Sequence, residues 1–188
     1  NHPLGALDGV ALIRFFGHFY SGKIKFLVND LLMHIKPLAP VFLPINKYGS
    51  QAKESSLQIN NAYESDEQML IFPAGLCSRL QHGKIKDLEW KKTFIAKAVQ
   101  SQRNIIPIYF EGRNSTFFYR FAQIRKCIGL KFNIELIYLP DEMFNSKNKT
   151  FDIYIGKPIP WQTFDKSKSL QEWAQIVKEK VYQIKKNQ

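Results

Sequence analysis

The feature that most constrains the fold of this chain is a regular alternation of helix-like and strand-like apolar patterns. Apolar side chains recur at helical spacing in five stretches, at 8–20, 53–65, 88–102, 115–129 and 170–186. Shorter extended patterns lie between them, at 23–29, 40–46, 68–75, 104–112, 132–139 and 151–159. Strands separated by helices of this length indicate a mostly parallel sheet covered on both faces. The sequence therefore predicts the α/β fold class, with a single domain over 1–188 and a mostly parallel central sheet flanked by helices.

The charge of the chain is strongly basic, and this limits the classes of partner. It carries 27 Lys and Arg residues against 16 Asp and Glu, a net charge of +11. Such a surface concentrates anions, so the candidates are nucleic acid, an anionic membrane surface and charged small molecules. The sequence contains no uncharged apolar stretch of about 18 residues, the length that spans a bilayer. Because the chain begins at Asn1 without a Met, we expect that its natural N-terminal segment is missing.

The metal-ligating residue types are sparse and scattered. Two cysteines, Cys77 and Cys127, are too few for a disulfide framework or a metal cluster. The histidines do not share metal-ligand spacing with a cysteine or a carboxylate pair. We therefore expect no metal site and no cofactor.

The opening segment, NHPLGALDGVALI, places His2 and Asp8 on either side of a Pro-Leu-Gly turn, just before an apolar helical pattern. A neutral imidazole accepts a proton near neutral pH, and a carboxylate bonded to its other nitrogen fixes the tautomer. If the turn folds the chain back, the two side chains form such a pair. The alternative is that Asp8 only caps the helix and that His2 is a surface residue.

A second motif, FPAGLCSR at 72–79, follows an apolar strand pattern. Pro73 and Gly75 shape a turn after Phe72, and Arg79 comes shortly afterwards. Ligands of open α/β sheets bind at the carboxyl ends of strands, and a turn with backbone N–H groups and a guanidinium suits an anion. The alternative is an ordinary loop with a solvated arginine.

Two further strand ends carry unusual residues. Pro107 interrupts the apolar segment IIPIYFEGR, as expected either of an edge strand or of a strand end that lines a pocket. Lys47 follows the extended segment LPIN and places another cation at a strand terminus.

In this order, the blocks His-x5-Asp, Lys47, Phe-Pro-x-Gly-x-x-Ser-Arg and Ile-Pro-Ile resemble the glycerophospholipid (lysophospholipid) acyltransferase superfamily. The resemblance covers residues 1 to about 112, and FDIYIGKPIP is similar to a strand that the family carries near its end. The resemblance implies that His2 deprotonates an acceptor hydroxyl and that Asp8 orients His2. The hydroxyl oxygen then attacks the thioester of an acyl-CoA or an acyl carrier protein, without an acyl-enzyme.

The resemblance also implies the substrate-binding positions, which are Lys47, Phe72, Pro73, Gly75, Arg79 and Pro107. Lys47 and Arg79 would bind an anion, the residues of the turn would shape the site, and Pro107 would lie in the wall of the acyl-chain or donor site.

The sequence departs from the usual family pattern in ways that bear on the acceptor. Five residues rather than four separate His2 from Asp8, so the turn has to absorb one residue. Ala74 stands where the family usually has Glu, Cys77 where it has Arg, and Asn46-Lys47 where it has Asp-Arg. A bidentate phosphate site is weakened by these changes. The chain is most similar to the hemolysin-like branch, whose members acylate the hydroxyl of an N-acylated amino-acid lipid of the ornithine or glycine type.

The expected partners are thus an acyl carrier protein or acyl-CoA, a lysolipid acceptor (a lyso-amino-acid lipid or lysophosphatidate) and an anionic membrane surface, with no nucleic acid. The expected location is peripheral, at the cytoplasmic face of the bacterial inner membrane. Two alternatives stay open: a basic nucleic-acid-binding module, and a thioester or lipid hydrolase. The first lacks nucleic-acid-binding motifs, and the second lacks a Gly-x-Ser-x-Gly elbow.

Overall fold

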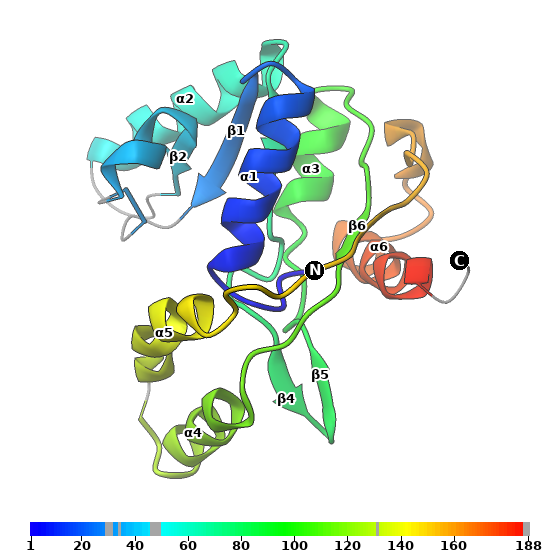
Figure 1. Cartoon of the computed structure of the whole chain (residues 1–188). Coiled ribbons are helices and arrows are strands. Elements are labelled where there is room, and N and C mark those ends of the chain that lie inside the picture. The colour runs from blue at the N-terminus through cyan, green and yellow to red at the C-terminus, as the bar shows by residue number, and fades with distance from the viewer. Residues whose placement is uncertain (29–31, 34, 46–49, 131, 186–188) are drawn as a thin grey trace. The chain divides into compact units, whose positions relative to one another are not determined.

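A computed structural model describes residues 1–28, 32–33, 35–45, 50–130 and 132–185 of the chain. The chain divides into two compact units, which are coloured by residue number in Figure 1. We call Ala11–Phe72 the sheet unit, and Asn1–Val10 together with Pro73–Gln188 the hairpin unit. Helix α1 (Leu7–Phe19) begins in the hairpin unit and continues in the sheet unit.

The sheet unit is built on three parallel strands. Its sheet has the order β2 (Phe42–Pro44), β1 (Ile24–Val28) and β3 (Gln68–Leu70). Central strand β1 buries alternate side chains, as its sequence pattern predicts, and Phe26 pairs in register with Phe42. Among its described residues, this unit also contains η2 (Lys36–Val41) and α2 (Ser50–Glu64).

The hairpin unit contains two antiparallel strand pairs and most of the helices. Strand β4 (Arg79–Gln81) pairs with β5 (Lys84–Lys86), and β6 (Ile108–Phe110) pairs with β7 (Ile153–Ile155). The helical elements are α3 (Thr93–Gln100), α4 (Thr116–Cys127), η3 (Ile134–Tyr138), α5 (Leu139–Phe144), η4 (Trp161–Thr163) and α6 (Leu170–Ile184). Helix α6 packs against both α3 and β6, and α4 packs against β4 and η3.

The predicted α/β class, with a parallel sheet and helices, is confirmed. The predicted helices at 8–20, 53–65, 88–102, 115–129 and 170–186 correspond to α1, α2, α3, α4 and α6. Ser115 is the N-cap of α4, where its hydroxyl accepts a hydrogen bond from the Phe118 N–H at 3.1 Å. The single domain over 1–188 stays a prediction.

One predicted strand is wrong, and one strand pair forms where no strand was predicted. The stretch 132–139 is not a strand, because it forms η3 and the first residue of α5. Glu135 is fully buried in ion pairs with Arg79 and Arg125, a tertiary contact that the alternating apolar pattern does not reveal. The hairpin β4–β5 lies in a stretch for which no strand was predicted. Its turn residues, His82 and Gly83, both adopt the positive φ angles that are typical of a tight hairpin turn.

Candidate active site

The N-terminal turn brings the imidazole of His2 against the carboxylate of Asp8. The His2 Nδ1 and Asp8 Oδ2 atoms lie 2.9 Å apart. The Leu4 N–H also donates to Oδ2, at 3.0 Å, which folds the Pro-Leu-Gly segment around the carboxylate. Gly5 has a φ angle of +83°, a left-handed conformation that an L side chain rarely adopts. The turn thereby absorbs the fifth residue between His2 and Asp8.

Asp8 is held as a carboxylate although it is fully buried. Its second oxygen, Oδ1, accepts the Gly9 N–H at 2.9 Å. Burial alone raises the pKa of a carboxyl group, but the His2 charge and the hydrogen bonds from His2, Leu4 and Gly9 outweigh burial. The pKa of Asp8 therefore lies below its ordinary value. Helix α1 begins at Leu7, so Asp8 lies within the first turn and is not the N-cap of the helix.

The pair has the geometry that general-base chemistry requires. A carboxylate only accepts hydrogen bonds, so the proton in the contact belongs to His2 Nδ1. When the ring is neutral and carries its proton on Nδ1, its lone pair is on Nε2, and the carboxylate stabilises the imidazolium that forms when Nε2 takes a proton. The side chain of His2 is 13% exposed, so most of the ring is shielded from water.

A second buried carboxylate, Asp87, binds the backbone of His2. The His2 N–H donates to Asp87 Oδ1 at 3.1 Å, and the Ser78 hydroxyl donates to the same oxygen at 2.6 Å. The other oxygen, Oδ2, accepts the indole N–H of Trp90 at 2.9 Å. The Ser78 N–H also donates to the His2 carbonyl at 2.7 Å. Both backbone groups of His2 are thus bound to buried partners.

Asn1 continues this arrangement one residue earlier. Its amide Nδ2 donates to the Phe110 carbonyl at 3.0 Å, and its Oδ1 accepts the Phe110 N–H at 2.6 Å. These bonds attach the chain before His2 to strand β6.

Motif 72–79 divides between the two units. Phe72 belongs to the sheet unit, where its ring packs edge-on against Phe26 at 5.3 Å between ring centroids. Pro73 begins the second part of the hairpin unit, and its carbonyl accepts the Lys91 N–H at 3.1 Å. Gly75 has a φ angle of +70°, which explains why the turn needs a glycine at this position.

Arg79 is buried and already has an anionic partner within the protein. Its guanidinium is 2.9 Å from Glu135, which in turn lies 2.7 Å from the Arg125 Nε. Arg79 also donates to the Cys77 carbonyl at 2.8 Å and lies over the Phe118 ring. Two guanidinium groups and one carboxylate leave one net positive charge in this cluster. The alternative that Arg79 is a solvated residue of an ordinary loop is therefore wrong. The anion-binding role of Arg79 stays a prediction.

Cys77 is a small core residue of this cluster. The pKa of its thiol is raised, because burial outweighs the nearby Arg79 charge. A thiol that stays protonated is a poor nucleophile.

Pro107 interrupts the strand ladder. An isolated bridge joins Ile105 to Ile159 before it, and the paired strand β6 starts directly after it at Ile108. Its carbonyl accepts the Gly156 N–H at 2.9 Å, and its ring packs so closely there that a Cβ on Gly156 would lie 2.9 Å from the proline Cγ. Pro107 thus lies at a break between the bridge and β6, and its role in a donor-site wall stays a prediction. Lys47 lies outside the described residues.

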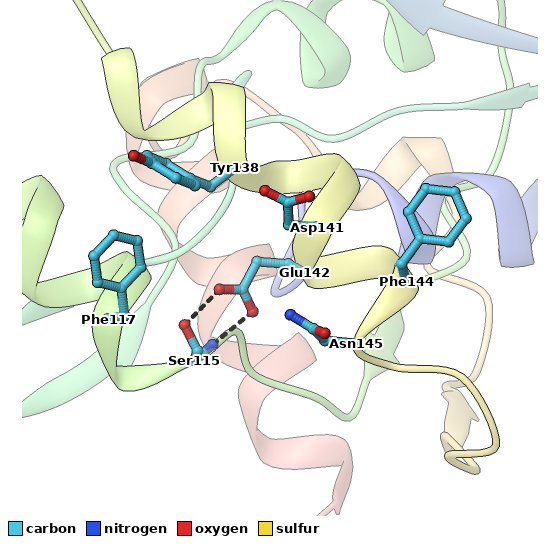
Figure 2. Close-up of a pocket in the computed structure, with 7 residues that line it drawn as sticks. All are labelled: Ser115, Phe117, Tyr138, Asp141, Glu142, Phe144 and Asn145. Atoms are coloured by element: carbon cyan, nitrogen blue, oxygen red, sulfur yellow. Dashed lines mark hydrogen bonds between the residues drawn. The ribbon is translucent and has the colours of Figure 1, made fainter.

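A hollow of about 410 Å³ lies between the start of α4 and the η3–α5 segment. Figure 2 shows the Phe117 and Tyr138 rings on one side and Phe144 on the other, with Glu142 between them. Glu142 accepts hydrogen bonds from the N–H of Ser115, at 2.8 Å, and from its hydroxyl. Both walls contact the turn between His2 and Asp8: Asn114 donates to the Leu4 carbonyl at 3.3 Å, and Leu139 packs closely against Gly5.

Comparison with known proteins identifies the family of this chain. Residues 1–188 match the family model described as acyltransferase. The chain belongs to the acyltransferase family. The acyltransferase activity and the lysolipid class of acceptor that the motifs predict agree with this membership and with the names of the relatives.

Two relatives are lyso-glycine lipid O-acyltransferases. That of Bacteroides thetaiotaomicron is 56% identical over 98% of this chain and 68% of its own length, and that of Phocaeicola vulgatus is 54% identical over 98% and 66%. The chain therefore spans about two thirds of the length of these relatives. A solved structure, the 1-acyl-sn-glycerophosphate acyltransferase PlsC from Thermotoga maritima, is similar with a TM-score of 0.49 and 16% identity, over 87% of this chain and 57% of that one.

Sequence reasoning found His2, Asp8 and the turn residues but missed Ser78 and Asp87. Ser78 lies within the FPAGLCSR motif, so its position was visible although its contact with the His2 carbonyl was not. Asp87 is nine residues further on, in a segment whose pattern carries no catalytic signal.

Among the described parts of the chain, no helix is long and apolar enough to cross a membrane.

Proposed function

We propose that His2 and Asp8 catalyse transfer of an acyl group from a thioester donor to the hydroxyl of a lyso-amino-acid lipid. The 2.9 Å contact between the His2 imidazole and the buried Asp8 carboxylate is the observation that carries this proposal. It supports a base at the place where the family motif requires one, in a chain more than half identical to two lyso-glycine lipid O-acyltransferases.

The reaction is a direct transfer. His2 Nε2 takes the proton of the acceptor hydroxyl while its oxygen attacks the thioester carbonyl, forming the new C–O bond. The tetrahedral intermediate then collapses, the C–S bond breaks, and the sulfur leaves as a thiolate that takes the proton from the imidazolium. The products are an ester and a free thiol, and the enzyme itself never carries the acyl group.

The acceptor is proposed to be of the lyso-glycine lipid type rather than lysophosphatidate. Arg79 supports this choice, because part of its charge is neutralised by Glu135 and its guanidinium is occupied by protein contacts. A phosphate monoester is best bound by a guanidinium with both N–H edges available. A single net charge in the Arg79–Glu135–Arg125 cluster suits a carboxylate better.

The remaining parts of the proposal concern the donor and the location. The thioester donor is acyl-CoA or an acyl carrier protein, with Lys47, Phe72, Pro73, Gly75, Arg79 and Pro107 as the proposed substrate-binding positions. The chain works peripherally at an anionic membrane, at the cytoplasmic face of the inner membrane. Its net charge of +11 supports attraction to that surface.

The proposal is tested by incubating the protein with a labelled acyl thioester and a panel of acceptors. The panel contains lyso-glycine lipid, lyso-ornithine lipid and lysophosphatidate, and products are identified by mass. We expect a diacylated product from the lyso-amino-acid lipids and none when His2→Ala replaces the wild-type protein. Full activity of folded His2→Ala would overturn the assignment of the base, and product from lysophosphatidate alone would overturn the assignment of the acceptor.

The two alternative functions are outcomes of companion measurements. Release of fatty acid without an acceptor, with no diacylated product, would indicate a hydrolase. Tight binding to an oligonucleotide with a steep salt dependence, in a protein without acyl transfer, would indicate a nucleic-acid-binding module.

A further inference from the structure

The hairpin unit exposes an apolar stripe along one face of α4. Phe117, Phe121, Ile124 and Ile128 are spaced at i, i+4, i+7 and i+11, which places them in one row. The side chains that α4 buries, Phe118, Tyr119 and Ala122, lie on another face of the helix. Phe117, Ile124 and Ile128 are 54%, 58% and 65% exposed. Isolated exposed apolar residues are common, but an ordered row of them indicates an interaction surface.

Two further exposed apolar side chains follow the row in the sequence. Phe132, just after α4, is 81% exposed, and Ile137 in η3 is 75% exposed. The Tyr138 ring of η3 packs edge-on against both Phe117 and Phe121, which joins the two elements into one surface. We call Phe117, Phe121, Ile124, Ile128, Phe132 and Ile137 the apolar ridge.

The segment that carries most of the apolar ridge is basic, whereas Asp141 and Glu142 of α5 line the hollow beside Phe117 and Tyr138. Residues 112–134 contain five Lys or Arg residues and no Asp or Glu. Arg120 lies next to the row, three residues after Phe117 and four before Ile124, and it is exposed together with Arg113 and Lys126. Glu135, the first acidic residue after this segment, is fully buried and paired. Exposed positive charge beside an apolar row favours an anionic lipid surface as the occupant.

We infer that the apolar ridge docks the protein on an anionic lipid bilayer. Its rings and aliphatic side chains enter the headgroup region, and Arg113, Arg120 and Lys126 contact lipid phosphates. Because Asn114, just before α4, and Leu139, directly after η3, contact the turn between His2 and Asp8, docking through α4 and η3 brings the proposed base close to acceptors in the membrane. The inference rests on the proposed function for its purpose, but lipid binding is measured without acyl transfer.

The experiment is co-sedimentation with vesicles of phosphatidylcholine mixed with phosphatidylglycerol, and with vesicles of phosphatidylcholine alone. We expect wild-type protein to bind the anionic vesicles and to bind the neutral vesicles weakly. The double variant Ile128→Ser/Phe132→Ser should bind about a hundredfold or more weakly, because each buried large apolar side chain contributes roughly a tenfold factor. The matched control is Phe19→Ser/Leu57→Ser, two side chains of the sheet unit that are 70% and 60% exposed. It should bind like wild type.

The charge is tested separately. Arg120→Glu/Lys126→Glu should lose about twentyfold or more in affinity for anionic vesicles, and Lys53→Glu/Lys84→Glu, the same charge change on exposed lysines elsewhere, should lose less. Equal losses in the two charge variants, or vesicle binding by Ile128→Ser/Phe132→Ser at the wild-type level, would overturn the ridge. No binding of wild type to anionic vesicles would also overturn it and would leave a protein segment as the occupant.

Vesicle binding and acyl transfer distinguish an error in the ridge proposal from an error in the proposed function. His2→Ala should bind vesicles normally and lose acyl transfer. Ridge variants should lose activity on vesicle-borne acceptor and keep it on detergent-dispersed acceptor. Loss of activity in both formats, with vesicle binding unchanged, would contradict the ridge.

A different observation carries a second inference: Asp87 is a positioning residue for His2. The buried Asp87 carboxylate is bonded to the His2 N–H, to the Ser78 hydroxyl and to Trp90, and Ser78 is bonded to the His2 carbonyl. The Asp8 and Asp87 carboxylates therefore bind different parts of His2: Asp8 orients the imidazole, and Asp87 fixes the backbone.

This inference is tested by Asp87→Asn and, in case that variant does not fold, by Ser78→Ala. Asp87→Asn should lower kcat about tenfold or more and leave KM within about twofold, because the base is misplaced while substrate contacts remain. Ser78→Ala should change kcat in the same direction by a smaller factor. Val177→Ala, a core truncation in α6, should lower Tm without changing kcat well below Tm. A wild-type kcat in folded Asp87→Asn, or a kcat loss in Val177→Ala equal to that in Asp87→Asn, would overturn it.

Discussion

The sheet unit and the hairpin unit bury different kinds of side chain. Around β1, the sheet unit packs Phe26, Val28 and Phe42 with further apolar residues. Seven polar or charged side chains are buried among the residues that the structure describes, and six of them belong to the hairpin unit: Asp8, Ser78, Arg79, Asp87, Asn114 and Glu135. Ser55 alone belongs to the sheet unit.

This difference separates a stability role from a chemical one. A parallel sheet with an apolar core gains its stability from burial and is insensitive to ionisation. Each buried carboxylate of the hairpin unit has hydrogen-bond or ion-pair partners within the protein, and a buried charge is costly when such partners are missing. Asp8 and Asp87 both hydrogen-bond to His2, so part of the polar core of this unit surrounds the proposed base.

The largest effect should come from removing the Asp8 charge while keeping its shape. Asp8→Asn should lower kcat by roughly 10³–10⁴-fold, because an amide neither fixes the tautomer of His2 nor stabilises its imidazolium. Steady-state acyl transfer measures this loss. Phe26→Ala, which removes a core ring of the sheet unit, is the matched variant: it should lower the unfolding free energy by about 3–5 kcal/mol and keep kcat at temperatures where it is folded. A kcat loss in Phe26→Ala equal to that in Asp8→Asn would remove the contrast between the units.

The next largest effect, on the unfolding free energy, is expected from removing a partner of the buried ion pairs. Glu135→Ala should lower the unfolding free energy by about 3–5 kcal/mol, because it leaves the Arg79 and Arg125 charges buried against each other. Ser55→Ala should cost the sheet unit about 1 kcal/mol or less. Urea unfolding at neutral pH measures both changes. Similar values for the two variants would show that the cores do not differ in their dependence on charge.

Gly5 in the hairpin unit and Gly22 in the sheet unit have similar backbone conformations, so substitutions at the two positions can be compared. Gly5 and Gly22 have φ angles of +83° and +81°, but a Cβ on Gly5 would lie 2.9 Å from Leu139, whereas Gly22 faces open space. Gly22→Ala should therefore cost about 1–2 kcal/mol of backbone strain alone. Gly5→Ala should cost about 1–3 kcal/mol more from overpacking. Gly5→Ala should also lower kcat, since it distorts the turn between His2 and Asp8. Thermal unfolding and activity assays check both expectations, and an unaffected kcat in Gly5→Ala would contradict the role of the turn.

A smaller effect is expected from acid. The pKa of Asp8 is lowered in the folded protein, so its contribution to stability is complete above the unfolded pKa of about 3.9 and is lost as the pH falls through the folded pKa. The difference in unfolding free energy between wild type and Asp8→Asn should thus shrink as the pH is lowered below about 4. Urea unfolding at a series of pH values tests this, and a difference that grows toward low pH would show that the sign is wrong.

The smallest effect concerns the two thiols. Cys127 is exposed and Cys77 is buried with a raised pKa, so a thiol reagent at neutral pH should modify Cys127 rapidly and Cys77 only on unfolding. Counting modified thiols by mass before and after denaturation checks this. Modification of Cys77 in the native protein would show that the polar core of the hairpin unit opens easily.

Local sequence signals predicted the helices and the main strands. The apolar rows of α1, α4 and α6 and the alternation in β1 are periodic within a few residues, so they are visible without knowledge of the rest of the chain. The His2–Asp8 pair was also accessible, because Pro3 and Gly5 between them are turn residues and the two partners are six positions apart.

Contacts between distant residues decided what the sequence left open. The segment 132–139 alternates like a strand, yet it becomes helical where Glu135 meets Arg79 from 56 residues away. Asp87 reaches His2 across 85 residues, and nothing in its neighbourhood marks it. Periodicity and turn chemistry are local properties of the chain, so they can be inferred from the amino-acid sequence alone. The tertiary structure decided which buried charges meet, because that depends on distant segments folding together and on the high cost of leaving a buried charge without a partner.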